Sequence, residues 1–202
     1  MHDCKPWDAH SELKEDRLVF LASLIKQVRH DALPFHEPSK GDTNWGLGCR
    51  VHERTCHAIK EASNNQPWLD VIDSSLHFVF SVGGVPIRFY RGEAENPNPR
   101  HLNRRYSEIE AQQLAFEFHL EDRQWLWRMA IETDFDGEVF RIVMVQVSEG
   151  GDVKNIWTIP LTGKVPIITP IHKRQREGVD LEPPVIAPRR VDTTKEISGN
   201  EK

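Results

Sequence analysis

The chain has 202 residues, of which 38% are hydrophobic and 28% charged, and its formal net charge is -5. This length fits one domain or one domain with a tail, and the negative charge argues against a general binder of polyanions. No apolar run is long enough for a membrane span, the first residues are too polar for a secretory signal, and three cysteines cannot form a closed disulfide framework. We therefore expect a cytoplasmic protein that does not contact a membrane.

The composition changes near residue 161, because all six tryptophans precede that point and five of the 13 prolines follow it. Residues 162–202 contain no Trp, Tyr or Phe and carry eight Lys or Arg against six Asp or Glu. Such a segment buries too little apolar surface to offset the entropy lost on ordering. We predict a single globular domain over residues 1–161, followed over 162–202 by an extended strap and a disordered tail that begins near residue 172.

Apolar periodicity predicts two N-terminal helices. Residues 11–30 repeat apolar side chains at intervals of three and four, with Ser11 as the N-cap. Residues 31–48 are rich in Gly and Pro and predict an irregular loop. Residues 49–63 form the second predicted helix, whose apolar face comprises Cys49, Val51, His52, Thr55, Cys56, Ala58, Ile59 and Ala62.

Alternating apolar residues predict six strands, over 76–82, 85–91, 114–120, 125–133, 138–148 and 153–160. Gly83-Gly84 predicts a tight hairpin in which Phe78, Phe80 and Val82 oppose Phe89, Ile87 and Val85 on the core face. The opposite face of each strand is expected to meet solvent. Pro86 suggests that its strand lies at a sheet edge or that its hydrogen-bonding position faces outward there. Because no β-α-β alternation is present, we predict an α+β fold with two helices packed on an antiparallel sheet of about six strands.

Basic and aromatic residues gather around this hairpin and the loop that follows it. Arginine presents a planar fork of donors to carboxylates and phosphates, and tyrosine can stack on a ligand. Arg91 falls on the core side of its strand, so we expect it at the sheet margin. The alternative is a solvated face whose charges pair with nearby glutamates. The candidate binding residues are His77, Arg88, Tyr90, Arg91, Arg100, His101, Arg104 and Arg105.

Cys49, His52 and Cys56 have the spacing that zinc ligands on one helix require. They lie among apolar residues, however, and no second motif supplies a fourth ligand, so we interpret them as packing residues. The acidic residues over 134–138 are interpreted as a turn instead of a cation site. We expect no metal and no cofactor.

The sequence contains no motif of a common enzyme class, and the catalytic residues of any activity are unknown. It favours a non-enzymatic binding or adaptor protein whose partner is another protein, contacted through the sheet face, the Arg-rich loop and the tail. An anionic ligand or a nucleic acid is the alternative partner of the loop, and an enzyme acting on a phosphorylated or nucleotide substrate is an alternative function.

A third function rests on a short resemblance. Residues 112–116, Gln-Gln-Leu-Ala-Phe, resemble the peptides by which bacterial proteins dock on the replication sliding clamp. The resemblance covers five residues and implies a toxin-like inhibitor of a cellular machine. In the strand predicted over 114–120, Leu114 and Phe116 are instead core side chains.

Truncation after residue 172 tests the predicted tail. Because disordered residues make few buried contacts, we expect the melting temperature of the truncated chain to stay within about 2 °C of that of the full chain, measured by circular dichroism. A fall of many degrees would show that the tail packs on the domain.

Overall fold

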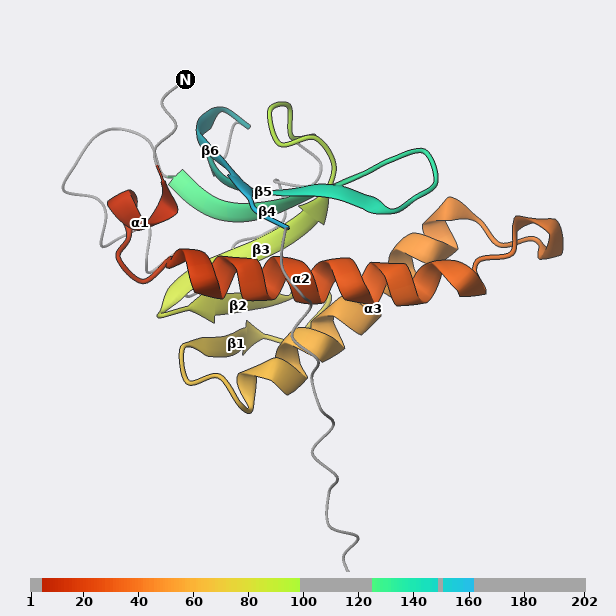
Figure 1. The fold of residues 1–202 in the computed structure, drawn as a ribbon, viewed down its shortest axis with the longest axis horizontal. Coiled ribbons are helices and arrows are strands. Elements are labelled where there is room, and N and C mark those ends of the chain that lie inside the picture. Colours follow the sequence, from red (N-terminus) through yellow and green to blue (C-terminus); the bar gives the residue numbers. More distant parts are fainter. Residues whose placement is uncertain (1–4, 99–124, 149–150, 162–202) are drawn as a thin grey trace, which may run out of the picture. The chain divides into compact units, whose positions relative to one another are not determined.

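The structure is a computed structural model that describes residues 5–98, 125–148 and 151–161 (Figure 1). The chain divides into two units, Met1–Ile167 and Ile168–Lys202, and every described residue belongs to the first unit. The predicted tail over 162–202 and the predicted strand over 114–120 lie outside the described residues.

Within the described ranges the helices are α1 (Pro6–Ala9), α2 (Glu15–Ala32) and α3 (Asn44–Ser63). Two short 3-10 helices, η1 (Leu33–Phe35) and η2 (Pro38–Lys40), connect α2 to α3. Pro34 within η1 ends α2, as the sequence predicts, because proline cannot continue an α-helix. No helix in the described part of the chain is long and apolar enough to cross a membrane.

Both long helices begin at other residues than predicted. Ser11 is not the N-cap of α2: the N-cap is Lys14, because the chain turns over residues 11–13 to bury Leu13 completely. The predicted loop over 31–48 is largely helical, because it contains η1, η2 and the first turn of α3. The N-cap of α3 is Thr43, whose side chain accepts a hydrogen bond from the Gly46 N–H at 3.1 Å.

The sheet has the strand order β1-β2-β3-β4-β5-β6 among the described residues. Its strands are β1 (Leu69–Asp73), β2 (Val79–Val82), β3 (Val85–Arg91), β4 (Trp125–Thr133), β5 (Val139–Ser148) and β6 (Val153–Ile159). Neighbouring strands are antiparallel except β3 and β4, which are parallel. The α+β fold is confirmed, but the sheet is mixed instead of wholly antiparallel.

The parallel pair corrects two expectations. Residues 92–124 separate β3 from β4, a connection long enough for the crossover that parallel strands require. With β4 on its other side, β3 is an interior strand and not an edge. Pro86 is tolerated because the pairing with β4 starts at Ile87, one residue later.

The hairpin of β2 and β3 has the predicted register, with Val82 opposite Val85 and Phe80 opposite Ile87. Gly83 and Gly84 have φ values of 57° and 85°, which favour glycine. A Cβ atom at Gly83 would also lie 2.5 Å from the Cβ atom of Glu12, so no larger residue fits there.

Two details at the start of the sheet differ from the prediction. The strand expected over 76–82 begins at Val79, and His77 lies in an exposed turn before it. The edge strand β1 was not predicted, because its sequence Leu-Asp-Val-Ile-Asp is short and half polar.

The main core lies between one face of the sheet and the two long helices. In Figure 1, α2 crosses this face, and it contacts β5 and β6, whereas α3 contacts β1. Leu18, Leu21, Leu24 and Ile25 of α2 and Ile59 and Ala62 of α3 point into this core, together with Phe80, Ile87, Met129, Met144 and Ile159 from the sheet. Phe78 and Phe89 also pack here, with ring centroids 6.2 Å apart. Val51, also predicted on the apolar face of the second helix, packs in a separate cluster with Ala32 and Leu47.

The opposite face of the sheet is buried too, which corrects the expectation of solvent there. Tyr90, Leu126 and Ala130 form a second apolar cluster with Val143, Val145 and Val147. Arg128 and Glu132, expected on a wet face of β4, are also buried. The sequence of a central strand that is covered on both faces does not show which face meets water, because both alternating sets of its side chains are enclosed.

Replacement of Phe80 by alanine tests the core. Its side chain is completely buried, so we expect the free energy of unfolding to fall by about 3–5 kcal/mol in denaturant titrations, from lost transfer energy and the cavity left behind. Leu76→Ala, at a residue 75% exposed, is the control and should change stability by less than about 0.5 kcal/mol. Equal effects of the two substitutions would contradict the described core.

Candidate functional site

A cleft of about 790 Å³ opens at the edge of the sheet where the parallel strands end. One wall comes from the end of α2, from η2 and from the first turn of α3, and the other from the β4–β5 hairpin. The residues after β3, beginning at Gly92, complete the lining. We name this hollow the β-edge cleft.

The backbone explains why the cleft forms at this edge. Arg91 and Ile131 are register partners in the parallel pair, and the Gly92 N–H donates to the Ile131 carbonyl at 3.1 Å. Both strands therefore deliver their carboxyl ends to one place. Ligands bind at the carboxyl ends of parallel strands in open α/β sheets, and this pair reproduces that local geometry.

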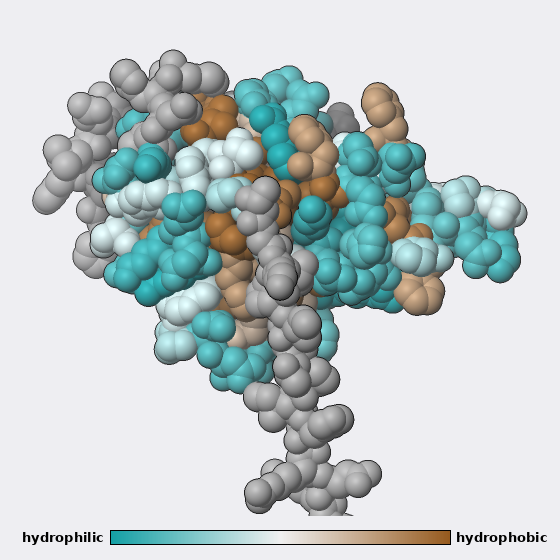
Figure 2. Space-filling model, viewed as in Figure 1, coloured by the Kyte–Doolittle hydropathy of each residue, from teal (hydrophilic) through white to brown (hydrophobic). Residues whose placement is uncertain are grey.

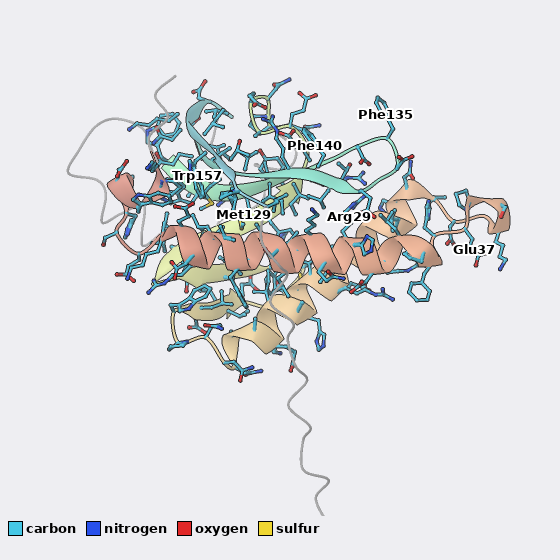
Figure 3. The ribbon with its side chains drawn as sticks, in the orientation of Figure 1. Arg29, Glu37, Met129, Phe135, Phe140 and Trp157 are labelled. Atoms are coloured by element: carbon cyan, nitrogen blue, oxygen red, sulfur yellow. The ribbon has the colours of Figure 1, made fainter. Side chains whose placement is uncertain are left out.

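Arg29 joins the helical wall to the hairpin (Figure 3). It comes from the last turns of α2, is only 3% exposed, and donates through Nε to the carbonyl oxygen of Gly137. Gly137 has a φ of 86°, and a Cβ atom there would lie 3.2 Å from Leu33, so glycine allows the turn to approach α2 closely. Burial lowers the pKa of the Arg29 guanidinium, and the positive charge of Arg91 lowers it further.

Two carboxylates lie close enough to Arg29 to act on its charge, because the negative charges of Glu138 and Asp134 raise its pKa and partly offset the effect of burial. Glu138 also accepts from His30 Nδ1 at 2.8 Å, and Asp134 Oδ1 accepts the Glu138 N–H at 2.9 Å. Among the residues that the structure describes, neither Arg29 nor Arg91 lies within ion-pair distance of a carboxylate. The β-edge cleft thus carries charges of both signs, with Arg29 and Arg91 beside four carboxylates: Glu93, Glu132, Asp134 and Asp136.

Exposed aromatic side chains line the same cleft. Of the five large hydrophobic residues that are exposed in the described ranges, two line the cleft: Phe135, 109% exposed, and Phe140, 58% exposed. Figure 2 shows apolar surface at the tip of the β4–β5 hairpin, where Figure 3 places Phe135. We name these two residues the aromatic rim.

The residues predicted to form a binding surface do not come together as expected. Arg88 and Tyr90 are each 8% exposed, so the expectation that they lie on an open sheet face is wrong. His77 is exposed in its turn, and Arg91 is exposed at the end of β3, at the sheet margin as expected, where it lines the β-edge cleft. The remaining candidates, Arg100, His101, Arg104 and Arg105, lie outside the described residues, and their binding role stays a prediction.

Buried polar groups on the second face of the sheet are linked to one another. The Tyr90 hydroxyl donates to the Glu93 carbonyl at 3.2 Å, and burial raises the pKa of Tyr90 to about 12. Glu132 accepts from the Ala94 N–H at 2.9 Å and from Arg141 Nε at 2.7 Å. These bonds satisfy groups that would otherwise be costly to bury, so they support a structural role for this cluster.

Cys56 packs against the main core, with its Sγ 3.6 Å from Nε2 of His52. The His52 ring in turn lies 5.2 Å from the ring of Phe89. Within the described residues no group of three or more His, Cys, Asp or Glu side chains is arranged to hold a metal ion. Burial raises the pKa of the Cys56 thiol to about 12, which suppresses the thiolate that a nucleophile or a zinc ligand needs.

Sequence reasoning missed Arg29 and the aromatic rim. Arg29 sits within a regular helix, and nothing in its neighbours distinguishes it from a solvated arginine. The rim left a weak signal, because Phe135 interrupts a polar turn. Comparison with family models, with curated proteins and with solved structures found no match.

The state of Cys56 can be tested with a variant that retains it as the single cysteine, Cys4→Ser/Cys49→Ser. With a pKa near 12 its thiolate fraction at pH 8 is small, so we expect alkylation by iodoacetamide about 100-fold slower than for free cysteine. The rate should keep rising with pH beyond 9 for as long as the chain stays folded. A rate that matches free cysteine, or a plateau near pH 8, would show an exposed or activated thiol.

Proposed function

We propose that this chain is a binding protein that docks a partner protein at the β-edge cleft. The observation that carries the proposal is the aromatic rim, because Phe135 and Phe140, two of the five large exposed hydrophobic residues in the described ranges, line this one hollow. Scattered exposed hydrophobic residues are ordinary, whereas their concentration around a concave surface is typical of an interaction site.

Aromatic side chains suit this role for a physical reason. They bury a large area on docking and lose little conformational entropy, so a few of them carry most of the binding energy in many interfaces. Phe135 lies in the β4–β5 turn and Phe140 near the start of β5, so both belong to the hairpin wall of the cleft. A segment lying in the cleft could contact both rings at once.

The proposal keeps the class of function that the sequence favours and assigns it another surface. Arg88 and Tyr90 are enclosed, and residues 112–116, on which the sliding-clamp hypothesis depends, lie outside the described residues. An enzyme acting on a phosphorylated or nucleotide substrate is the second candidate. Arg29 and Arg91 favour it, because both line the cleft and both could bind an anionic group.

The docking site is tested with the double variant Phe135→Ala/Phe140→Ala in the full chain. Both side chains are largely exposed, so the melting temperature should not change. Affinity-tagged chains are incubated with extract, and bound proteins are quantified by mass spectrometry. We expect at least one protein whose capture by the wild type falls about tenfold or more with the double variant, the loss expected for two aromatic anchors.

The matched control is Leu76→Ala, which removes an exposed large hydrophobic side chain that does not line the cleft. It should capture the same protein at the wild-type level. Equal capture by all three chains would contradict docking at the cleft. Sedimentation measurements complete the test, because self-association that only the double variant abolishes would assign the cleft to a second copy of the chain.

A further inference from the structure

The charge that a docked segment would meet in the β-edge cleft is mainly negative. Three of the lining carboxylates are exposed: Glu93, Asp134 and Asp136. Among the described residues that line the cleft, Arg91 is the one exposed guanidinium. Arg29 is almost completely buried, and the negative charge of Asp134 already acts on it. The accessible charge of the described walls therefore favours a positively charged ligand.

Two of these carboxylates have no cation bound to them in the described part of the chain. Neither Glu93 nor Asp136 lies within ion-pair distance of a basic group there. Asp134 differs, because its Oδ1 accepts a backbone N–H of the turn at 2.9 Å. Glu132, the fourth lining carboxylate, is buried and already paired with Arg141. Glu93 and Asp136 are thus the charges that a partner can neutralise.

An aromatic ring stands beside these charges. Phe135 lies between Asp134 and Asp136 in the sequence, and Figure 3 places it at the tip of the β4–β5 hairpin, with its side chain 109% exposed. A guanidinium suits this combination, because the face of a ring attracts a cation and carboxylates accept its N–H donors. A wholly apolar ligand would desolvate the neighbouring carboxylates without supplying a counter-charge.

The same hairpin already holds one arginine in this way. The guanidinium of Arg141 donates to Glu132 at 2.7 Å and to Glu95 at 2.8 Å. Its central carbon also lies 5.6 Å from the centroid of the Phe140 ring. One ring and two carboxylates thus bind a guanidinium within the chain. The cleft presents the same set of groups, with no arginine bound to them among the described residues.

We propose that the docked partner carries an arginine that binds to Phe135, Asp136 and Glu93. The guanidinium lies against the ring and pairs with the carboxylates, while an apolar residue beside it in the partner contacts the remainder of the aromatic rim. The partner segment is therefore basic and partly apolar. This inference names the chemistry of the partner and rests on the function proposed above.

The subsite is tested first with acetyl-arginine amide, whose guanidinium is its only charge. Acetyl-citrulline amide is the matched ligand, because it keeps the planar shape and is neutral. Each is titrated into the 15N-labelled full chain at constant low ionic strength, and the backbone N–H signals of Gly92 and Gly137 are followed by NMR. We expect a saturable shift with the arginine ligand and binding about fivefold weaker with the citrulline ligand. Equal binding of the two ligands, or a shift that does not saturate, would overturn the subsite.

Two variants identify the groups that bind the arginine. Glu93→Gln/Asp136→Asn removes both charges at exposed positions, so the melting temperature should not change and arginine binding should weaken about threefold or more. Phe135→Leu keeps an apolar side chain but removes the ring, and it should weaken binding about twofold or more. Binding at the wild-type level by either variant would contradict the assignment.

Glu53→Gln/Glu61→Gln is the control, because it removes the same charge from two exposed positions of α3 that do not line the cleft. It should bind the arginine ligand as the wild type does. An equal loss in this control would show that only the net charge of the chain attracts the ligand, and would overturn the subsite. Inorganic phosphate is titrated in the same way, and tighter binding of phosphate than of arginine would reverse the sign of the ligand.

The two proposals fail in different ways. Capture of the docked partner should fall with Glu93→Gln/Asp136→Asn as well as with Phe135→Ala/Phe140→Ala. If only the aromatic variant loses the partner, the docking site stands and the arginine subsite is wrong. If acetyl-arginine amide binds as expected while the aromatic variant retains every partner, the docking function is wrong.

Discussion

The parallel pairing of β3 with β4 at the centre of the sheet is the constraint on which the candidate site depends. Parallel strands deliver their carboxyl ends to one edge, and here that edge receives Arg91 from β3 and residues 131–133 from β4. The β4–β5 hairpin continues past this edge, and α2 ends beside it. A wholly antiparallel arrangement would place these two ends on opposite edges, and the β-edge cleft would lose its floor.

Arg29 connects the two walls and sets the geometry of the cleft. Its bond to the Gly137 carbonyl holds the hairpin turn against the end of α2, and Gly137 allows the close approach. Arg29 also lines the cleft, so one residue serves the packing of the domain and contributes positive charge to this hollow.

The second face of the sheet shows how the fold accommodates polar residues in its interior. Arg88 and Arg128 are register partners on the parallel strands. Glu132 is held by Arg141, which also binds Glu95 at 2.8 Å. The pairing of Glu132 with Arg141 limits the desolvation cost of burying the carboxylate. Arg88 and Arg128, two basic residues of this face, therefore belong to a structural layer of the described chain, whereas Arg91 at the end of β3 is accessible.

The sequence by itself determined the local elements, because their signals lie within short windows: the apolar face of α3, the hairpin at Gly83-Gly84, and the strands over 125–133 and 153–159. It did not determine the direction of β3 relative to β4, the burial of Arg88 and Tyr90, or the position of Arg29 in a cleft. Those depend on which distant segments lie side by side. Alternation along a strand separates two sets of side chains, but only the tertiary structure decides whether one set or both are covered, because the covering segments come from elsewhere in the chain.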